Sequence, residues 1–250
     1  MSGHSHWAGI KRKKGVADAK RSAQFSKVAR IIMTAAREGG GDPDANAKLK
    51  NAVDKARQVN MPKDNIERAI KKGTGELPGV SFEEATYEGY GPGGVAVLVE
   101  VLTDNRNRTT SELRKLFETR GGNMGSSGCV AWMFEKKGLI TIDTSAIGED
   151  ELLDLALDAG ADDMKAAGSF YEITTSVTDF AQVKASLEQK NLPFQIAEIT
   201  SLPKQTASVE GDVARRVLAL LEELEDHEDV QNVYANFDIS DELFQDLANN

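Results

Sequence analysis

The chain has 250 residues and a mass of 27.1 kDa, with 30 Lys and Arg against 40 Asp and Glu and a net charge of −10. This length allows two domains or three small ones, and 40% hydrophobic residues can fill real cores, which excludes a wholly disordered chain. Apolar runs such as Val95–Val99 are far below the roughly 18 residues that span a bilayer, and no apolar signal segment opens the chain. We therefore expect a cytoplasmic protein with no membrane partner. The single cysteine, Cys129, excludes an internal disulfide and a cysteine zinc cluster.

The positive charge is concentrated near the N-terminus. Residues 1–75 carry 17 Lys and Arg against 7 Asp and Glu, whereas residues 76–250 carry 13 against 33. Such a division predicts a nucleic acid or another acidic partner for the basic segment. The alternative interpretation is that two oppositely charged domains dock on each other.

The basic segment predicts an arm followed by three short amphipathic helices. The arm, Met1–Lys14, has no hydrophobic period. From Val16 apolar residues recur at helical spacing, and Gly39–Gly41 is expected to end that helix. A second helix is predicted after Asp42–Asp44. A third is predicted to begin at Pro62, which suits a first helical turn, and to close at Gly73.

The candidate nucleic-acid contacts are the basic residues of this segment. In the first helix they recur opposite the apolar stripe, as a row about 25 Å long. On the third helix Asn65 and Arg68 are the candidates for reading base edges. The alternative is that these residues form an ordinary solvated face. The full set is Lys11, Arg12, Lys13, Lys14, Lys20, Lys27, Arg30, Arg37, Lys63, Asn65, Arg68, Lys71 and Lys72.

The acidic remainder predicts mixed strands and helices. Thr109 and Glu112 have the spacing of a capping box, and the run after Gly94 suits a strand buried on both faces. In chain order we expect a turn at Tyr87–Gly94, a strand at Val95–Leu102, a helix at Thr110–Thr119, a loop at Gly121–Gly128 and a strand at Cys129–Phe134.

The next segment predicts a βαββαβ unit, which is the ferredoxin-like plan. Its elements are expected at Leu139–Ile142, Glu151–Ala159, Asp162–Ala166, Phe170–Thr174, Phe180–Gln189 and Phe194–Ile199. A helix over Val213–Leu224 and a strand over Val230–Asp238 follow, and they can be buried only against the elements before Trp132. We therefore predict an α+β protein of three domains: 1–78, a discontinuous α/β domain of 79–131 plus 206–250, and an inserted ferredoxin-like domain of 132–205.

Other residues carry weaker signals. Arg106 and Arg108, beside a predicted helix N-terminus, could contact a phosphate or be solvated loop arginines. The acidic run around His227 could bind a divalent cation, but a solvated acidic edge is the favoured interpretation. Ser2–His4 has the arrangement of a copper or nickel site if Met1 is removed. Cys129 is expected to be inert, and we predict no catalytic residues, metal or cofactor.

Several segments together resemble one family. They are His4–Trp7 with the basic run after it, Phe25–Lys27, Asn60–Ile70, Tyr87–Gly94, Thr103–Arg108 and Gly121–Gly125. From end to end the chain resembles the bacterial YebC/PmpR family of probable transcriptional regulatory proteins, which has a mitochondrial relative in the translational activator of cytochrome c oxidase. The resemblance implies three domains and a non-enzymatic regulator. It leaves two targets open, promoter DNA for a transcriptional regulator and ribosomal RNA for a ribosome-associated translation factor.

The leading hypothesis is a monomeric, DNA-binding transcriptional regulator whose basic segment holds phosphates. The alternative is a translation factor that binds the ribosome. Two other classes remain: an enzyme that acts on a phosphorylated small molecule through Gly121–Gly128 or the two arginines, and a scaffold that offers the acidic helix Val213–Glu225 to a basic partner.

Overall fold

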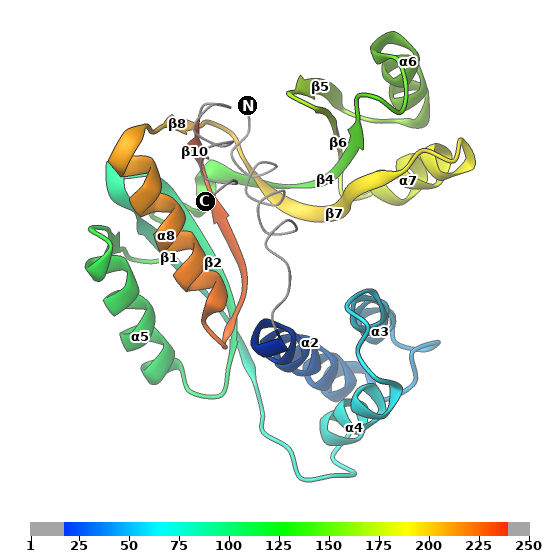
Figure 1. Cartoon of the computed structure of the whole chain (residues 1–250). Coiled ribbons are helices and arrows are strands. Elements are labelled where there is room, and N and C mark those ends of the chain that lie inside the picture. The colour runs from blue at the N-terminus through cyan, green and yellow to red at the C-terminus, as the bar shows by residue number, and fades with distance from the viewer. Residues whose placement is uncertain (1–17, 240–250) are drawn as a thin grey trace.

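The computed structural model describes residues 18–239, with side chains from residue 22 onward (Figure 1). The arm with Lys11–Lys14, and the Ser2–His4 segment, lie outside this range. The described part contains a helical bundle, a first sheet of order β3-β1-β2-β9 and a second sheet of order β5-β6-β4-β7. This arrangement confirms the predicted α+β class. No helix in residues 18–239 is long and apolar enough to cross a membrane.

The bundle consists of α2 (Asp18–Gly39), α3 (Ala47–Gln58) and α4 (Lys63–Gly73), which confirms the three predicted helices. Their apolar stripes meet in a core of its own, around Ile32, Leu49 and Ala56. Asn46 caps α3 by accepting a hydrogen bond from the Leu49 N–H at 3.1 Å. Its amide also donates to the Ala35 and Gly40 carbonyls at 2.8 and 2.9 Å, so one side chain ties the end of α2 to the start of α3.

Gly73 ends α4 as predicted, but for a different reason. A Cβ at this position would lie 2.5 Å from the Met33 carbonyl oxygen, so the residue must be glycine for α4 to approach α2 this closely. The left-handed backbone after the helix is instead found at Gly75, with φ of 84°. Pro62 stands one residue before the helix, as its N-cap.

The first sheet is antiparallel and consists of β1 (Glu83–Tyr90), β2 (Ala96–Thr103), β3 (Asn123–Met124) and β9 (Val230–Ala235). Helices α5 (Arg106–Thr119) and α8 (Gly211–Asp226) cover one face (Figure 1). On that face Val97 and Val99 pack with Phe117 and Leu220. On the other face Leu98 packs with a second cluster around Val130, Phe134 and Tyr234. Strand β2 is thus buried on both faces, as its sequence predicts.

Two local predictions in this region were wrong. Tyr87–Tyr90 is strand and not turn, because β1 pairs with β2 along this whole stretch, and the turn is limited to the 3-10 segment η1 (Pro92–Gly94). Helix α5 begins at Arg106 and not at Thr110, because Asn105 is its N-cap and accepts from the Arg108 N–H at 3.1 Å. Thr109 is buried inside the helix.

A third wrong prediction concerns Cys129–Phe134, where only Phe134 is strand and the residues before it form a turn around a buried carboxylate. Glu88, on β1, accepts hydrogen bonds from the backbone N–H groups of Gly128, Val130 and Ala131 at 2.6, 2.7 and 2.7 Å. The chain bends around this group and continues into the 3-10 segment η2 (Ala131–Met133). Burial alone would raise the pKa of Glu88, but the three N–H donors outweigh it and lower the pKa.

The second sheet belongs to the predicted ferredoxin-like unit. In chain order it contains β4 (Phe134–Asp143), α6 (Glu149–Ala159), β5 (Asp163–Ala167), β6 (Phe170–Thr175), α7 (Phe180–Gln189) and β7 (Phe194–Pro203). All its strand pairs are antiparallel, and its core is separate from those of the bundle and the first sheet. Its entry and exit meet, because Phe134 pairs with Pro203.

The predicted strand Val230–Asp238 is divided in two. β9 ends at Ala235, and β10 (Phe237–Asp238) pairs in parallel with β8 (Ala207–Ser208). The division lies at Asn236, which is buried. Its side chain accepts from the Ala96 N–H at 2.7 Å and donates to the Gln205 carbonyl at 3.2 Å. Its backbone also donates to the Ala96 carbonyl at 3.1 Å and accepts from the Ala207 N–H at 2.7 Å, so one residue joins the first sheet to the pair of β8 and β10.

Candidate nucleic-acid interface

The outer surface of the bundle presents several of the predicted basic contacts to solvent. Arg37 lies in the last turn of α2, and Lys63, Asn65, Arg68 and Lys71 project from α4. Within residues 22–239, no carboxylate lies within ion-pair distance of Arg37, Arg68 or Lys71, whereas Lys63 lies 3.5 Å from Glu67. Lys72 is half-buried and lines a cleft beside Pro78–Val80. The side chain of Lys20, on α2, is not described.

Helix α3 adds exposed cations that the sequence reasoning omitted. They could have been found from the helical period that buries Leu49, Val53 and Ala56, since residues about a quarter turn or more away from this stripe must face outward. Lys48 pairs with Glu38 at 2.7 Å and Arg57 with Asp54 at 3.0 Å. The exposed set on α3 is Lys48, Lys50, Lys55 and Arg57.

The middle of the predicted basic row on α2 does not face solvent. The Arg30 side chain is only 12% exposed and lies with its guanidinium 5.1 Å from the centre of the Phe82 ring. It donates to the Leu102 carbonyl at 3.3 Å, to the Asp229 carboxylate and to Glu228 at 3.1 Å. Lys27 donates to the Glu225 carbonyl near the end of α8. In the structure these two residues of the predicted row contact the acidic part of the chain, as the docking alternative expects, and their contact with phosphates stays a prediction.

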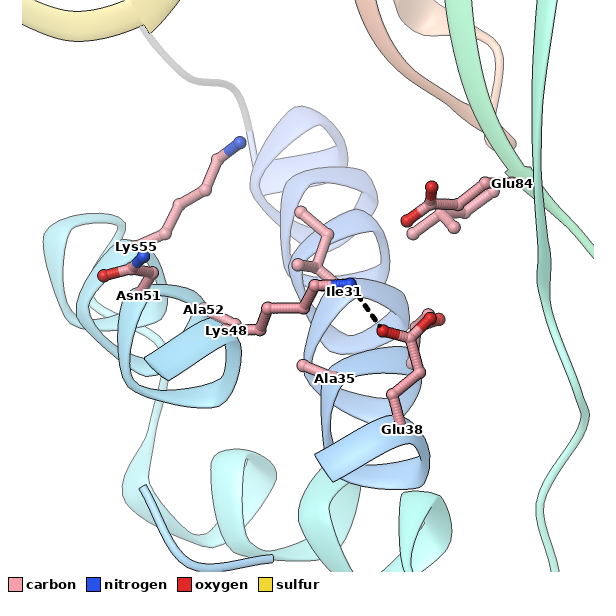
Figure 2. Close-up of a pocket in the computed structure, with 10 residues that line it drawn as sticks. Ile31, Ala35, Glu38, Lys48, Asn51, Ala52, Lys55 and Glu84 are labelled. Atoms are coloured by element: carbon pink, nitrogen blue, oxygen red, sulfur yellow. Dashed lines mark hydrogen bonds and ion pairs between the residues drawn. The ribbon is translucent and has the colours of Figure 1, made fainter. Parts of the chain in front are cut away.

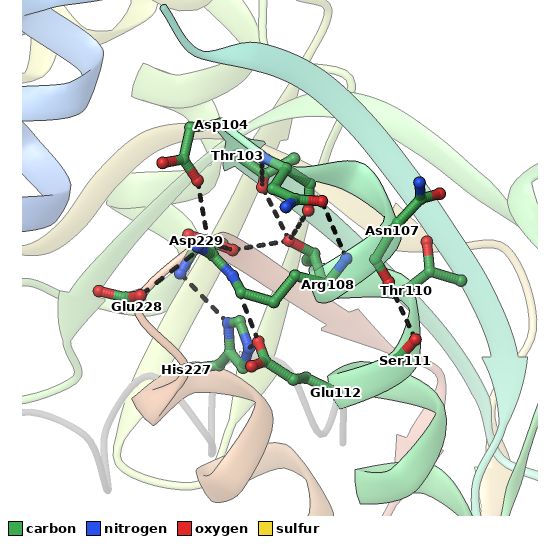
Figure 3. A network of polar contacts seen from close by, with 12 residues as sticks. Thr103, Asp104, Asn107, Arg108, Thr110, Ser111, Glu112, His227, Glu228 and Asp229 are labelled. Atoms are coloured by element: carbon green, nitrogen blue, oxygen red, sulfur yellow. Dashed lines mark hydrogen bonds and ion pairs between the residues drawn. The ribbon is translucent and has the colours of Figure 1, made fainter. Parts of the chain in front are cut away.

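Arg108 is likewise matched by carboxylates of the protein (Figure 3). Its guanidinium lies 2.7 Å from Asp229, 3.1 Å from Asp104 and 3.7 Å from Glu112. It is thus not a solvated loop arginine, because carboxylates of the protein already match its charge, although 35% of the side chain stays exposed. Arg106 differs, because its side chain is 58% exposed and its nearest carboxylate, on Glu83, is 3.9 Å away.

Asp229 is the centre of this network. It is fully buried and accepts hydrogen bonds from Arg30, from Arg108 at 2.7 Å and from the Thr109 hydroxyl at 2.7 Å. Burial alone would raise its pKa, but these three donors outweigh that effect and lower the pKa to about 2. Asp229 is therefore a carboxylate at neutral pH. One buried anion holds cations from α2 and from α5, which lie in different parts of the fold.

The acidic run after Leu221 is not a uniformly solvated edge, contrary to the sequence interpretation. Glu223 pairs with Arg120, with a 3.0 Å bond to the guanidinium Nε, and Asp229 is buried. Ligand atoms of Glu112, His227 and Asp229 lie within 4.8 Å of one another, a spacing that a metal could use.

Two observations argue against a metal at this cluster. His227 Nδ1 accepts from the Asp229 backbone N–H at 3.2 Å, which leaves the proton on Nε2 to donate to Glu112 at 3.0 Å. The guanidinium groups of Arg30 and Arg108 already neutralise Asp229 and would repel a cation. The three side chains are therefore better explained as part of the Arg108 network (Figure 3).

A cleft of about 290 Å³ separates α2 and α3 from the nearby strand ends. Figure 2 shows Ile31, Glu38 and Lys48 on its bundle side and Glu84 on the opposite side. Its lining combines apolar groups with the Lys48–Glu38 ion pair. Among the described residues, the lining contains no paired nucleophile and base of the kind that acyl or phosphoryl chemistry needs.

Comparison with known proteins places this architecture in one family. A model described as the TACO1/YebC N-terminal domain matches residues 5–76, and one described as the TACO1/YebC second and third domain matches residues 82–237. A relative from Natranaerobius thermophilus is 56% identical over 98% of this chain and 99% of its own length. Another, from Trichlorobacter lovleyi, is 57% identical over 96% and 97%. Both are named probable transcriptional regulatory protein.

A solved structure supports the same assignment. The crystal structure of a conserved hypothetical protein from Aquifex aeolicus has a TM-score of 0.77 and 47% identity, and the match covers 90% of this chain and 93% of that one. The resemblance seen in the sequence motifs is thus confirmed. The chain belongs to the TACO1/YebC family, whose matched relatives carry the name probable transcriptional regulatory protein.

Proposed function

We propose that this protein is a non-enzymatic transcriptional regulator that binds DNA phosphates through the outer cations of its bundle. The observation that carries the proposal is the set of exposed, unpaired cations Arg37, Arg68 and Lys71, on helices whose opposite faces are buried. Lys and Arg that neutralise phosphates release condensed counterions from DNA, which is the main source of affinity for such surfaces. The names of the relatives support a role in transcription.

The charge of the rest of the chain supports one orientation on the nucleic acid. Residues 76–250 carry 33 acidic against 13 basic residues, so phosphates repel this part and attract the bundle. Asn65 and Arg68 are exposed on the same helix and are the candidates for base contacts. We expect affinity to depend steeply on salt and only weakly on sequence.

The test is a titration of a labelled DNA duplex at several salt concentrations. The variant is Arg37→Gln/Arg68→Gln/Lys71→Gln, and the control Arg114→Gln/Lys115→Gln/Lys190→Gln removes the same charge from exposed positions elsewhere. Each lost phosphate contact should reduce the slope of log K against log salt by about 1. For the bundle variant, the slope of log K against log salt should therefore be smaller in magnitude by about 2 to 3 than for the parent chain. Equal losses in variant and control would refute the assignment.

Crosslinking in cells tests whether the target is DNA. We expect adducts enriched at a small number of promoters, with ribosomal RNA at background. Adducts concentrated in ribosomal RNA would overturn the DNA assignment and support the translation-factor alternative.

We also propose the domain boundaries 1–78, 79–131 with 206–250, and 132–205. The separate apolar cores of the bundle and the two sheets support this division. Limited proteolysis should cut first in the exposed segment 74–81 and release the bundle. We propose that the protein acts as a monomer, which sedimentation equilibrium tests.

A further inference from the structure

The joint between the bundle and the first sheet is polar and open at both sides. The two parts have separate apolar cores, and residues 74–81, which connect them, are all exposed. One side of the joint is the 290 Å³ cleft of Figure 2, and a second cleft of about 380 Å³ lies between Met33, Lys72 and Phe82. Joints of this polar kind allow relative motion unless specific contacts hold them closed.

The contacts that hold this joint converge on one group of acceptor oxygens, from two carboxylates and one helix-end carbonyl, which we call the acidic seat. It consists of the Glu225 carbonyl, the Glu228 carboxylate and the Asp229 carboxylate. Lys27 donates to the first of these, and Arg30 donates to the other two. The Glu225 carbonyl carries the negative end of the α8 dipole, because the last carbonyls of a helix have no partner within it.

The carboxylates of the acidic seat offer Arg30 the same chemistry that nucleic-acid phosphates would offer, and the helix-end carbonyl offers Lys27 a partly negative oxygen. An arginine fork binds carboxylate and phosphate oxygens with the same geometry. Lys27, Arg30 and Arg37 fall on one face of α2, over about 15 Å of helix, from its rise of ~1.5 Å per residue. Only Arg37 is exposed in the structure.

We infer that the acidic seat is an intramolecular competitor of nucleic acid, and that the joint opens to extend the binding surface. In the closed form the seat covers Lys27 and Arg30. In the open form the bundle pivots on residues 74–81 and these cations join Arg37 on the phosphates. This inference rests on the proposed function. By linkage, whatever opens the seat raises affinity for nucleic acid, and nucleic acid opens the seat by the same factor.

Fluorescence resonance energy transfer across the joint measures opening directly. Dyes are placed at Gln58→Cys in α3 and Thr119→Cys in α5, two exposed positions, in a full-length Cys129→Ala background. Asp229→Asn should change the transfer efficiency without DNA and raise affinity for a DNA duplex by about 5- to 150-fold, the usual range of such couplings. Adding the duplex to the labelled parent chain should change the efficiency in the same direction.

Two further variants separate opening from simple charge effects. Glu223→Gln removes one negative charge, as Asp229→Asn does, but from a carboxylate that pairs with Arg120 and not with the bundle. The transfer efficiency of this variant should therefore equal that of the parent chain. Arg30→Gln should open the joint but give a smaller gain in affinity than Asp229→Asn, because opening then exposes Lys27 alone. If Asp229→Asn does not fold, Glu228→Gln replaces it, since Glu228 is 66% exposed and lies 3.1 Å from Arg30.

The outcomes distinguish this inference from the proposed function. If the duplex binds through Arg37, Arg68 and Lys71, but neither the duplex nor the seat variants change the efficiency, the competition is refuted and the proposed function stands. If the seat variants open the joint and affinity rises no more than in Glu223→Gln, the competition is also refuted. If no duplex binds the parent chain, the proposed function itself fails.

Discussion

The carboxylate of Glu88 should make a large contribution to stability for a single side chain. It is 5% exposed and accepts from three backbone N–H groups at 2.6–2.7 Å. In Glu88→Gln the remaining oxygen can still accept from Val130 and Ala131, but the amide NH₂ then faces the Gly128 N–H. The variant loses one charge-assisted bond and leaves a backbone donor unpaired, which together cost about 2–4 kcal/mol.

Urea unfolding measures this loss in a Trp7→Phe background, where Trp132 beside the turn is the single tryptophan and can be excited selectively at wavelengths that tyrosine does not absorb. Hydrogen exchange at the Gly128, Val130 and Ala131 amides reports the same turn locally. Glu118→Gln, at an exposed position on α5, removes the same charge without a buried partner and is the control.

The pH dependence gives a second check. The folded pKa of Glu88 lies below the unfolded value of 4.5, so its contribution is fully present above pH 4.5 and is lost as the pH falls through the folded pKa. The difference in the free energy of unfolding between the parent chain and Glu88→Gln should therefore become smaller below pH 4.5. A loss under about 0.5 kcal/mol at pH 7, with unchanged amide protection, would refute the view that this carboxylate shapes the turn.

Three other substitutions test the packing and the network. Phe117→Ala, in the core of the first sheet, should cost about 3–5 kcal/mol in urea unfolding. Gly73→Ala should lower the melting temperature by circular dichroism, although alanine favours helices, because its Cβ would meet the Met33 carbonyl; an unchanged or higher value would show that α4 can move away. For Asp229, folding lowers the pKa from 3.8 to about 2, which corresponds to about 2 kcal/mol of the free energy of unfolding. This contribution is fully present above pH 3.8 and is lost as the pH falls through about 2. Asp229→Asn should lose that much at pH 7, and equal urea midpoints for variant and parent would contradict it.

The elements predicted correctly are those in which a hydrophobic period determines the structure by itself. Helices α2 and α8 lie within a few residues of their predicted bounds, and so do most strands of the second sheet. In these segments the spacing of the buried residues is by itself enough to distinguish a helix from a strand. The failures are places where a distant side chain decides. The bend at 128–131 depends on Glu88, about 40 residues earlier, and the start of α5 on the Asn105 cap.

The candidate interface shows the same division. Periodicity separates the polar face of α2 from its buried face, but Arg30 and Arg37 look alike in sequence. They differ only in what lies opposite them, and for Arg30 that is Asp229, 199 residues further along the chain. In the sequence Asp229 cannot be distinguished from the other acidic residues around His227. Only the fold shows that it is buried between Arg30 and Arg108.

The late position of β9 in the chain constrains how the molecule is made. Strand β2 needs β9 as a neighbour, with Val97 opposite Ala235, yet the whole ferredoxin-like unit is translated between them. At 5–20 residues per second, the interval is on the order of 10 s. During that time the edge of β2 away from β1 has no strand beside it, although the bundle and β1 have already been synthesised. The nascent chain therefore has an aggregation-prone edge that chaperones should recognise, and a stop codon before residue 230 leaves that edge permanently uncovered.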